Sequence, residues 1–191
     1  MSKNADLIDI CNTVSKWINR SLIPEPDITG LADICDLNKY DEKYSAEDLK
    51  TVVDTAFKQK SQQFNNETEL QFENYENLLS LVIMVAKHGS CSGGLPINLL
   101  ADIFDCRTLD ECQQLFILIE NKVDVWKEEC FFKNVKNQLL RSCNDLLRRL
   151  SRSQNTVFCG RILVFLARFF PLFERSGLNL NSDFNHENAT T

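Results

Sequence analysis

Hydrophobic residues recur at steps of three and four along most of this 191-residue chain, which places them on one face of an α-helix. Seven segments carry this spacing, at residues 7–18, 49–57, 72–86, 96–104, 109–123, 132–150 and 157–170. Six glycines and four prolines leave few turns for a hairpin-rich β-fold. The pattern therefore predicts an all-α protein, an array of six to seven helices packed as antiparallel hairpins. A HEAT-like solenoid is one shape open to such an array, although no clean internal repeat identifies it.

Polar residues mark where some of these helices begin and end. Ser45 and Asp48 resemble a capping box, and Thr108 and Glu111 form a better one. Helices are therefore expected to begin just after Ser45 and Thr108. The polar stretch 59–69 is predicted to be a loop.

Composition divides the chain into three parts. Pro24 and Pro26 end the first helix and open a polar connector. The residues after the last predicted helix are mostly polar, and we expect them to fray. The predicted parts are an N-terminal helix with its polar connector (1–44), a helical domain (45–175) and a polar tail (176–191).

Charge is distributed unevenly along the chain. Residues 1–130 carry 12 Lys and Arg against 23 Asp and Glu, a balance of −11, whereas residues 131–191 carry 9 against 4, a balance of +5. The acidic part argues against wrapping by nucleic acid, while the basic end suits phosphate or an acidic partner. No signal-peptide pattern is present, and the longest apolar stretch, 81–86, is far shorter than the roughly 20 residues that cross a bilayer. We therefore predict a cytosolic or nuclear protein without membrane contact.

Eight cysteines invite a metal or disulfide interpretation, but their spacing favours neither. The sequence has no Cys-x-x-Cys pair, and its two histidines, His88 and His186, lie far apart. A structural zinc site needs ligands joined by short spacers. Most of the cysteines fall at helix-core spacing, as Cys143 does, where a reduced thiol packs as a small hydrophobe. The sequence predicts neither a metal nor another cofactor.

The segment His88–Gly94 is rich in glycine and resembles a nucleophile loop or a phosphate cradle. A phosphate loop needs a strand before it and a Lys-Ser/Thr after it, and the sequence has neither. A His88–Cys91 pair would also need a third group to orient it. The two residues more simply end a helix. We predict no enzyme and no small-molecule substrate. A cysteine-dependent enzyme is kept only as a third interpretation of the chain, and it depends on this loop at Cys91.

Arginines gather on one predicted helix face near the C-terminal end. Arg141, Arg148 and Arg152 are spaced by seven and four, so they share the face opposite the hydrophobic stripe, and Arg149 flanks them. Asp145 lies four residues after Arg141 and is placed to pair with it. The row is either a solvated face or a surface for RNA phosphate or an acidic partner. A run of charges usually means no more than a solvated face, whereas the planar, bidentate recognition of phosphate and carboxylate by arginine supports the second interpretation.

The segment Val157–Phe170 is apolar on most of its circumference. A helix of this kind is buried on several sides, and as the last predicted helix it would have one side uncovered. We therefore predict a protein interface that includes Phe165, Phe169 and Phe170. The alternative is that the tail folds back and covers the helix through Leu178, Leu180 and Phe184.

Several runs near the C-terminal end resemble the N-terminal region of the THO complex subunit 1 family. They are Leu139–Ser151, Ser153–Ile162, Phe165–Arg168, Pro171-Leu172 and Ser176–Leu180, within a matching block at about residues 95–188. Before residue 70 the resemblance is weak.

The resemblance implies a non-enzymatic scaffold subunit of the nuclear complex that couples transcription to mRNA processing and export. Its partners would be other THO subunits and export factors, with RNA contacted through the complex. Family members are several times longer and carry a C-terminal death-like domain, so we expect this chain to be a fragment, a truncated isoform or an incomplete gene model. The runner-up is a stand-alone helical RNA-binding protein that uses the arginine face.

Overall fold

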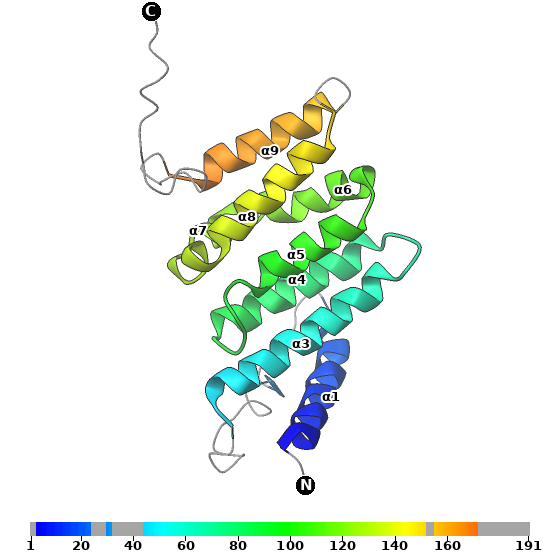
Figure 1. The fold of residues 1–191 in the computed structure, drawn as a ribbon, viewed down its shortest axis with the longest axis vertical. Coiled ribbons are helices and arrows are strands. Elements are labelled where there is room, and N and C mark those ends of the chain that lie inside the picture. The colour runs from blue at the N-terminus through cyan, green and yellow to red at the C-terminus, as the bar shows by residue number, and fades with distance from the viewer. Residues whose placement is uncertain (1–2, 24–29, 32–43, 152–154, 172–191) are drawn as a thin grey trace, which may run out of the picture.

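The computed structural model describes residues 3–23, 30–31, 44–151 and 155–171, in which eight helices are present (Figure 1). These described residues form no β-strand, so the all-α prediction is confirmed. The helices are α1 (Lys3–Ser21), α3 (Ala46–Asn65), α4 (Phe72–Lys87), α5 (Leu95–Cys106), α6 (Leu109–Glu120), α7 (Val123–Lys127), α8 (Glu129–Arg149) and α9 (Thr156–Phe169).

Two helix boundaries differ from the sequence prediction. The predicted loop at 59–69 is wrong over its first half, because α3 continues to Asn65. Ser61 and Phe64 are buried and extend the inward stripe of α3 by one more turn, so packing stabilises a segment that is mostly polar. At the other boundary, the helix predicted to reach Val123 ends at Glu120, and the five-residue α7 follows it.

Both predicted capping boxes are present. The Ser45 hydroxyl accepts a hydrogen bond from the Asp48 backbone N–H at 3.1 Å, and the Asp48 carboxylate accepts one from the Ser45 N–H at 3.0 Å. Thr108 and Glu111 bond in the same reciprocal way. These contacts satisfy backbone donors that a helix start leaves without an intrahelical partner.

The helices stack in two rows. In one row α3 contacts α5 and α5 contacts α8. In the other row α4 contacts α6, and α6 contacts α9 through the ring of Phe116, which lies 5.5 Å from Phe158 and 5.6 Å from Phe165 between ring centres. Figure 1 shows α1 at one end of the stack, packed on α3, and α9 at the other. This arrangement of hairpins is compatible with the HEAT-like shape.

One hydrophobic core runs through the stack from Ile10 in α1 to Phe169 in α9. Trp126 of α7 is fully buried in it and donates an indole hydrogen bond to the Ile119 carbonyl at 3.1 Å. The core therefore anchors α8 and α9 against the rest of the chain, and the outward faces of these two helices are set by that packing.

Candidate interaction surfaces on the last two helices

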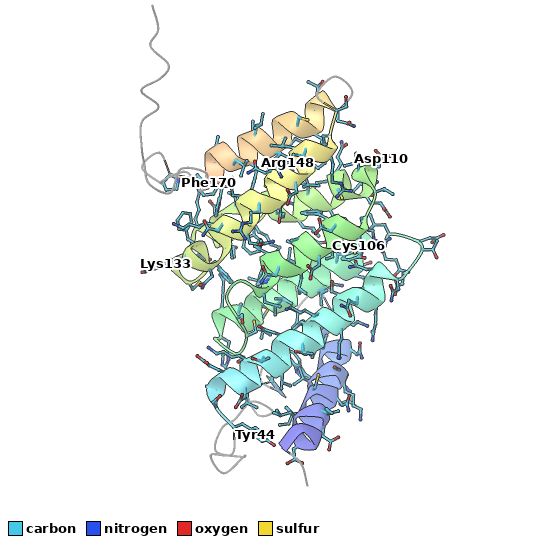
Figure 2. All side chains as sticks on the ribbon, viewed as in Figure 1. Tyr44, Cys106, Asp110, Lys133, Arg148 and Phe170 are labelled. Carbon is cyan, nitrogen blue, oxygen red and sulfur yellow. The ribbon has the colours of Figure 1, made fainter. Side chains whose placement is uncertain are left out.

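Three of the four arginines singled out in the sequence, Arg141, Arg148 and Arg149, are exposed on α8, but their partners differ. Figure 2 labels Arg148 on this helix. The Arg148 guanidinium lies 3.5 Å from the Asp145 carboxylate, and the Arg148 side chain is 80% exposed. Asp145 therefore pairs with Arg148, three residues away, rather than with Arg141 as the sequence suggested. Arg152 lies outside the described residues.

Arg149 has a different environment from Arg148. Its guanidinium donates hydrogen bonds to the carbonyl oxygens of Phe104 at 2.6 Å and Arg107 at 2.8 Å, at the C-terminal end of α5. The last carbonyls of a helix lack intrahelical donors and carry partial negative charge, so a cation stabilises them. Arg149 thus joins α8 to α5, and this contact occupies two of the five N–H donors that the sequence interpretation assigned to RNA or an acidic partner.

Arg107 is a buried cation that the sequence reasoning missed. One of its terminal nitrogens donates to the Phe64 carbonyl and to the Tyr75 hydroxyl, each at 2.8 Å. The other lies 3.4 Å from the Glu111 carboxylate. Arg107 therefore links α3, α4 and α6. No periodic signal marks it, since two of its partners, Phe64 and Tyr75, lie 43 and 32 residues away in the sequence.

Arg161 belongs to α9 but points towards α6. It forms an ion pair with Glu120 and donates to the Gln113 carbonyl at 3.3 Å. A hollow of about 310 Å³ lies beside it, lined by Asp110, Gln113, Gln114, Ile117 and Arg161. Arg161 thus fixes the position of α9 against α6.

The inner face of α9 consists of large side chains that are buried in the chain's own core: Phe158, Ile162, Phe165 and Phe169. Phe165 is 3% exposed and Phe169 is fully buried, with the Phe132 ring of α8 at 5.4 Å from the Phe169 ring. Phe170 is half-buried and its ring lies 4.8 Å from that of Phe169. The structure thus places the aromatic residues of the predicted interface mainly inside the chain.

The outer face of α9 is apolar as well. Val157, Leu163 and Val164 are 73%, 56% and 59% exposed. Ala167 is exposed between them and the end of the helix, and Arg168 is the one charged residue in the exposed set of α9. A solvated helix face normally carries polar side chains. The sequence reasoning predicted an interface through Phe165, Phe169 and Phe170 and did not single out the residues that the structure leaves exposed. A helix that is apolar on all sides gives no periodic signal of which side faces the core.

The loop at His88–Gly94 does not have the geometry of a nucleophile or of a phosphate cradle. Cys91 is buried, and burial raises the pKa of its thiol to about 12. The His88 Nδ1 lies 2.8 Å from the Ser90 hydroxyl, while the backbone N–H and the hydroxyl of Ser92 both donate to the Asp54 carboxylate. The loop is therefore held by α3, and an anion would meet a carboxylate there.

The described part of the chain shows no cluster of metal ligands and no candidate membrane span. Within it, no group of three His, Cys, Asp or Glu residues is placed to hold a metal ion. No described helix is both long and apolar enough to span a bilayer.

Comparison with known sequences identifies the chain's relatives. The sequence model of the family described as "THO complex subunit 1 transcription elongation factor" matches residues 75–191, which include nearly all of α4 and every helix after it. The chain belongs to the THO complex subunit 1 family. Helices α1 and α3 lie outside the match.

Named members of the THO complex subunit 1 family are similar to part of the chain. The human THO complex subunit 1 is 55% identical over 118 residues, which are 62% of this chain and 18% of that protein. The mouse protein of the same name is 54% identical over the same length. The protein of that name from Arabidopsis thaliana is 43% identical over 114 residues, 60% of this chain and 19% of that protein. The alignments thus span about a fifth of each relative, and no solved structure matches this chain.

Proposed function

We propose that this chain acts as a non-enzymatic scaffold segment of a nuclear THO-like complex that couples transcription to mRNA processing and export. The family match over residues 75–191 carries the proposal. Its partners would be other THO subunits and export factors, since the relatives are named as subunits of a complex.

The two surfaces on α8 and α9 support this role. Exposed arginines on α8 and exposed aliphatic residues on α9 suit contacts with macromolecules, and large exposed apolar patches usually mark interaction sites. A scaffold needs such surfaces on a rigid frame, and the continuous core of the stack provides that frame.

Purification of the tagged chain from nuclear extract tests the proposal. We expect THO subunits to co-purify with it in stable proportion, as measured by quantitative mass spectrometry. A tagged helical protein of similar size and net charge serves as the control. Recovery of the chain as a free monomer without any THO subunit would contradict the proposal.

A second candidate function is direct RNA binding by the outward face of α8. It is favoured by the exposure of Arg141 and Arg148 on one side of the helix. Replacing both with Gln should lower RNA affinity and reduce the slope of affinity against salt by about one to two phosphate contacts. Unchanged affinity and slope would assign these residues to a solvated face. Arg149 is unsuitable for this test because it holds the end of α5.

A further inference from the structure

The exposed apolar residues of α9, together with the half-buried Gly160, follow a regular helical spacing. Val157, Gly160, Val164 and Ala167 are separated by three, four and three residues, and Leu163 lies beside them. This is the spacing of a seam that packs against another helix. Gly160 has no side chain and Ala167 only a methyl group, so the backbone of a second helix is able to come close at these two positions.

Gly160 supplies independent evidence for an external contact. Glycine is a poor helix former, and it usually occurs inside a helix where a neighbour approaches closely. A Cβ atom added at Gly160 would meet nothing within 4 Å. The chain's own packing therefore does not require a glycine here, whereas a helix docked on the outer face would.

The α8 flank of the seam is basic. Between Lys133 and Arg149, α8 carries five cationic residues and one acidic residue, and α8 packs beside α9. Lys133 and Arg148 lie towards opposite ends of α8 (Figure 2), and Arg168 is exposed on α9 itself. A second copy of the chain is a poor occupant, since docking α9 on α9 would bring two basic rims together. RNA is a poor occupant of the seam because its exposed residues are aliphatic and offer no ring for base stacking.

We propose that the outer face of α9, with the basic rim of α8, binds an acidic amphipathic helix of a partner protein. Aliphatic side chains of that helix would cover Val164 and its neighbours, and carboxylates on its flank would meet Arg141, Arg148 and Arg168. This inference rests on the proposed function only for the identity of the complex, because the seam and its charge are properties of this chain.

Photo-crosslinking locates the occupant. A photoreactive phenylalanine analogue replaces Val164 in the full chain, which is then assembled in nuclear extract, and the same analogue at Lys58, exposed on α3, is the control. Sequencing of the cross-linked peptides should give, from Val164 only, a helix-forming segment richer in Asp and Glu than in Lys and Arg. Cross-links to RNA, to a second copy, to residues 172–191 of the same chain, or to nothing would overturn the inference.

The same samples separate the two proposals. An acidic helical segment from a protein outside any THO complex would support the docking inference and contradict the proposed function. THO subunits recovered without such a cross-link would support the proposed function and contradict the docking inference.

Substitutions at the seam test the sign of the partner's charge. Leu163→Glu and Leu163→Lys remove the same apolar contact, but only Glu would repel an acidic helix. We expect Glu to lower the yield of the Val164 cross-link to the partner segment roughly tenfold more than Lys does, with the melting temperature unchanged in both. Equal losses would overturn the acidic character of the partner.

Gly160→Ala should change the stability of the chain and its partner binding in opposite directions. Alanine should raise the melting temperature of the isolated chain, since it favours the helix and meets open space. It should also lower the yield of the Val164 cross-link several-fold, because the added methyl group keeps a docked helix away. A variant that is stabilised and still cross-links at full yield would overturn the close approach that we infer.

Discussion

Helices α8 and α9 form one hairpin and pack against the same core, but their outward faces differ. Both turn buried aromatic and aliphatic side chains inward. Outward, α8 presents Arg141, Asp145 and Arg148, whereas α9 presents Val157, Leu163 and Val164. Contact with solvent accounts for the charged side chains on the outward face of α8, but it does not account for the aliphatic side chains on the outward face of α9. An inward apolar stripe is explained by the chain's own fold, whereas an outward apolar stripe indicates a contact with another molecule.

The largest effect should come from the inner stripe of α9. Phe169→Ala removes a fully buried ring that contacts Phe132 and Phe165. We expect the free energy of unfolding to fall by about 3–5 kcal/mol, measured by urea denaturation. Val164→Ala on the outer face should change it by less than about 0.5 kcal/mol. Equal losses at the two positions would show that the outer face is also covered within the chain.

A smaller difference is expected between two neighbouring arginines of α8. Arg149→Gln breaks charged hydrogen bonds to the end of α5 and should lower the free energy of unfolding by about 1.5–3 kcal/mol. Arg148→Gln removes an exposed ion pair and should cost roughly 0–1 kcal/mol. The same denaturation series measures both variants. If Arg148 proved the more costly of the two, the assignment of Arg149 to the fold would be wrong.

The reactivity of the cysteines should show the same contrast between buried and exposed positions. Burial raises the pKa of Cys143 to about 12, as it does for Cys91, while Cys130 is exposed. At pH 8 we expect iodoacetamide to modify Cys130 rapidly and to leave Cys91 and Cys143 intact until the protein unfolds, as mass spectrometry of the peptides will measure. Rapid modification of Cys91 in the folded chain would reopen the nucleophile interpretation.

The raised thiol pKa values also predict a small loss of folding stability at alkaline pH. A thiol whose pKa is higher in the folded state than the usual value of 9.0 keeps its proton longer when folded. The stability gained from this is fully present below pH 9 and is lost as the pH rises towards 12. A denaturation midpoint that rises over this window would contradict the burial of Cys91 and Cys143.

The sequence allowed much of the fold to be predicted, because helix periodicity and capping are local. The boxes at Ser45 and Thr108 lie where predicted. The end of α3 was missed because Ser61 is polar yet packs inside, a fact that depends on distant neighbours.

The candidate surfaces were harder to predict. Arg148 and Arg149 are adjacent in sequence, and only the position of α5, more than 40 residues earlier in the chain, distinguishes them. In α9 the apolar residues surround the helix, so periodicity could not show that Phe165 faces inward and Val164 outward. Tertiary packing decides both cases.

The measurement that tests the account most directly is co-purification of THO subunits with an outer-face variant. Leu163→Glu with Val164→Glu adds two charges to the seam, while Thr51→Glu with Lys58→Glu places carboxylates on exposed positions of α3. We predict that the α9 variant loses the THO subunits with an unchanged melting temperature, and that the α3 variant retains them. Full recovery of the subunits with the α9 variant would contradict the claim that this face holds the chain in its complex.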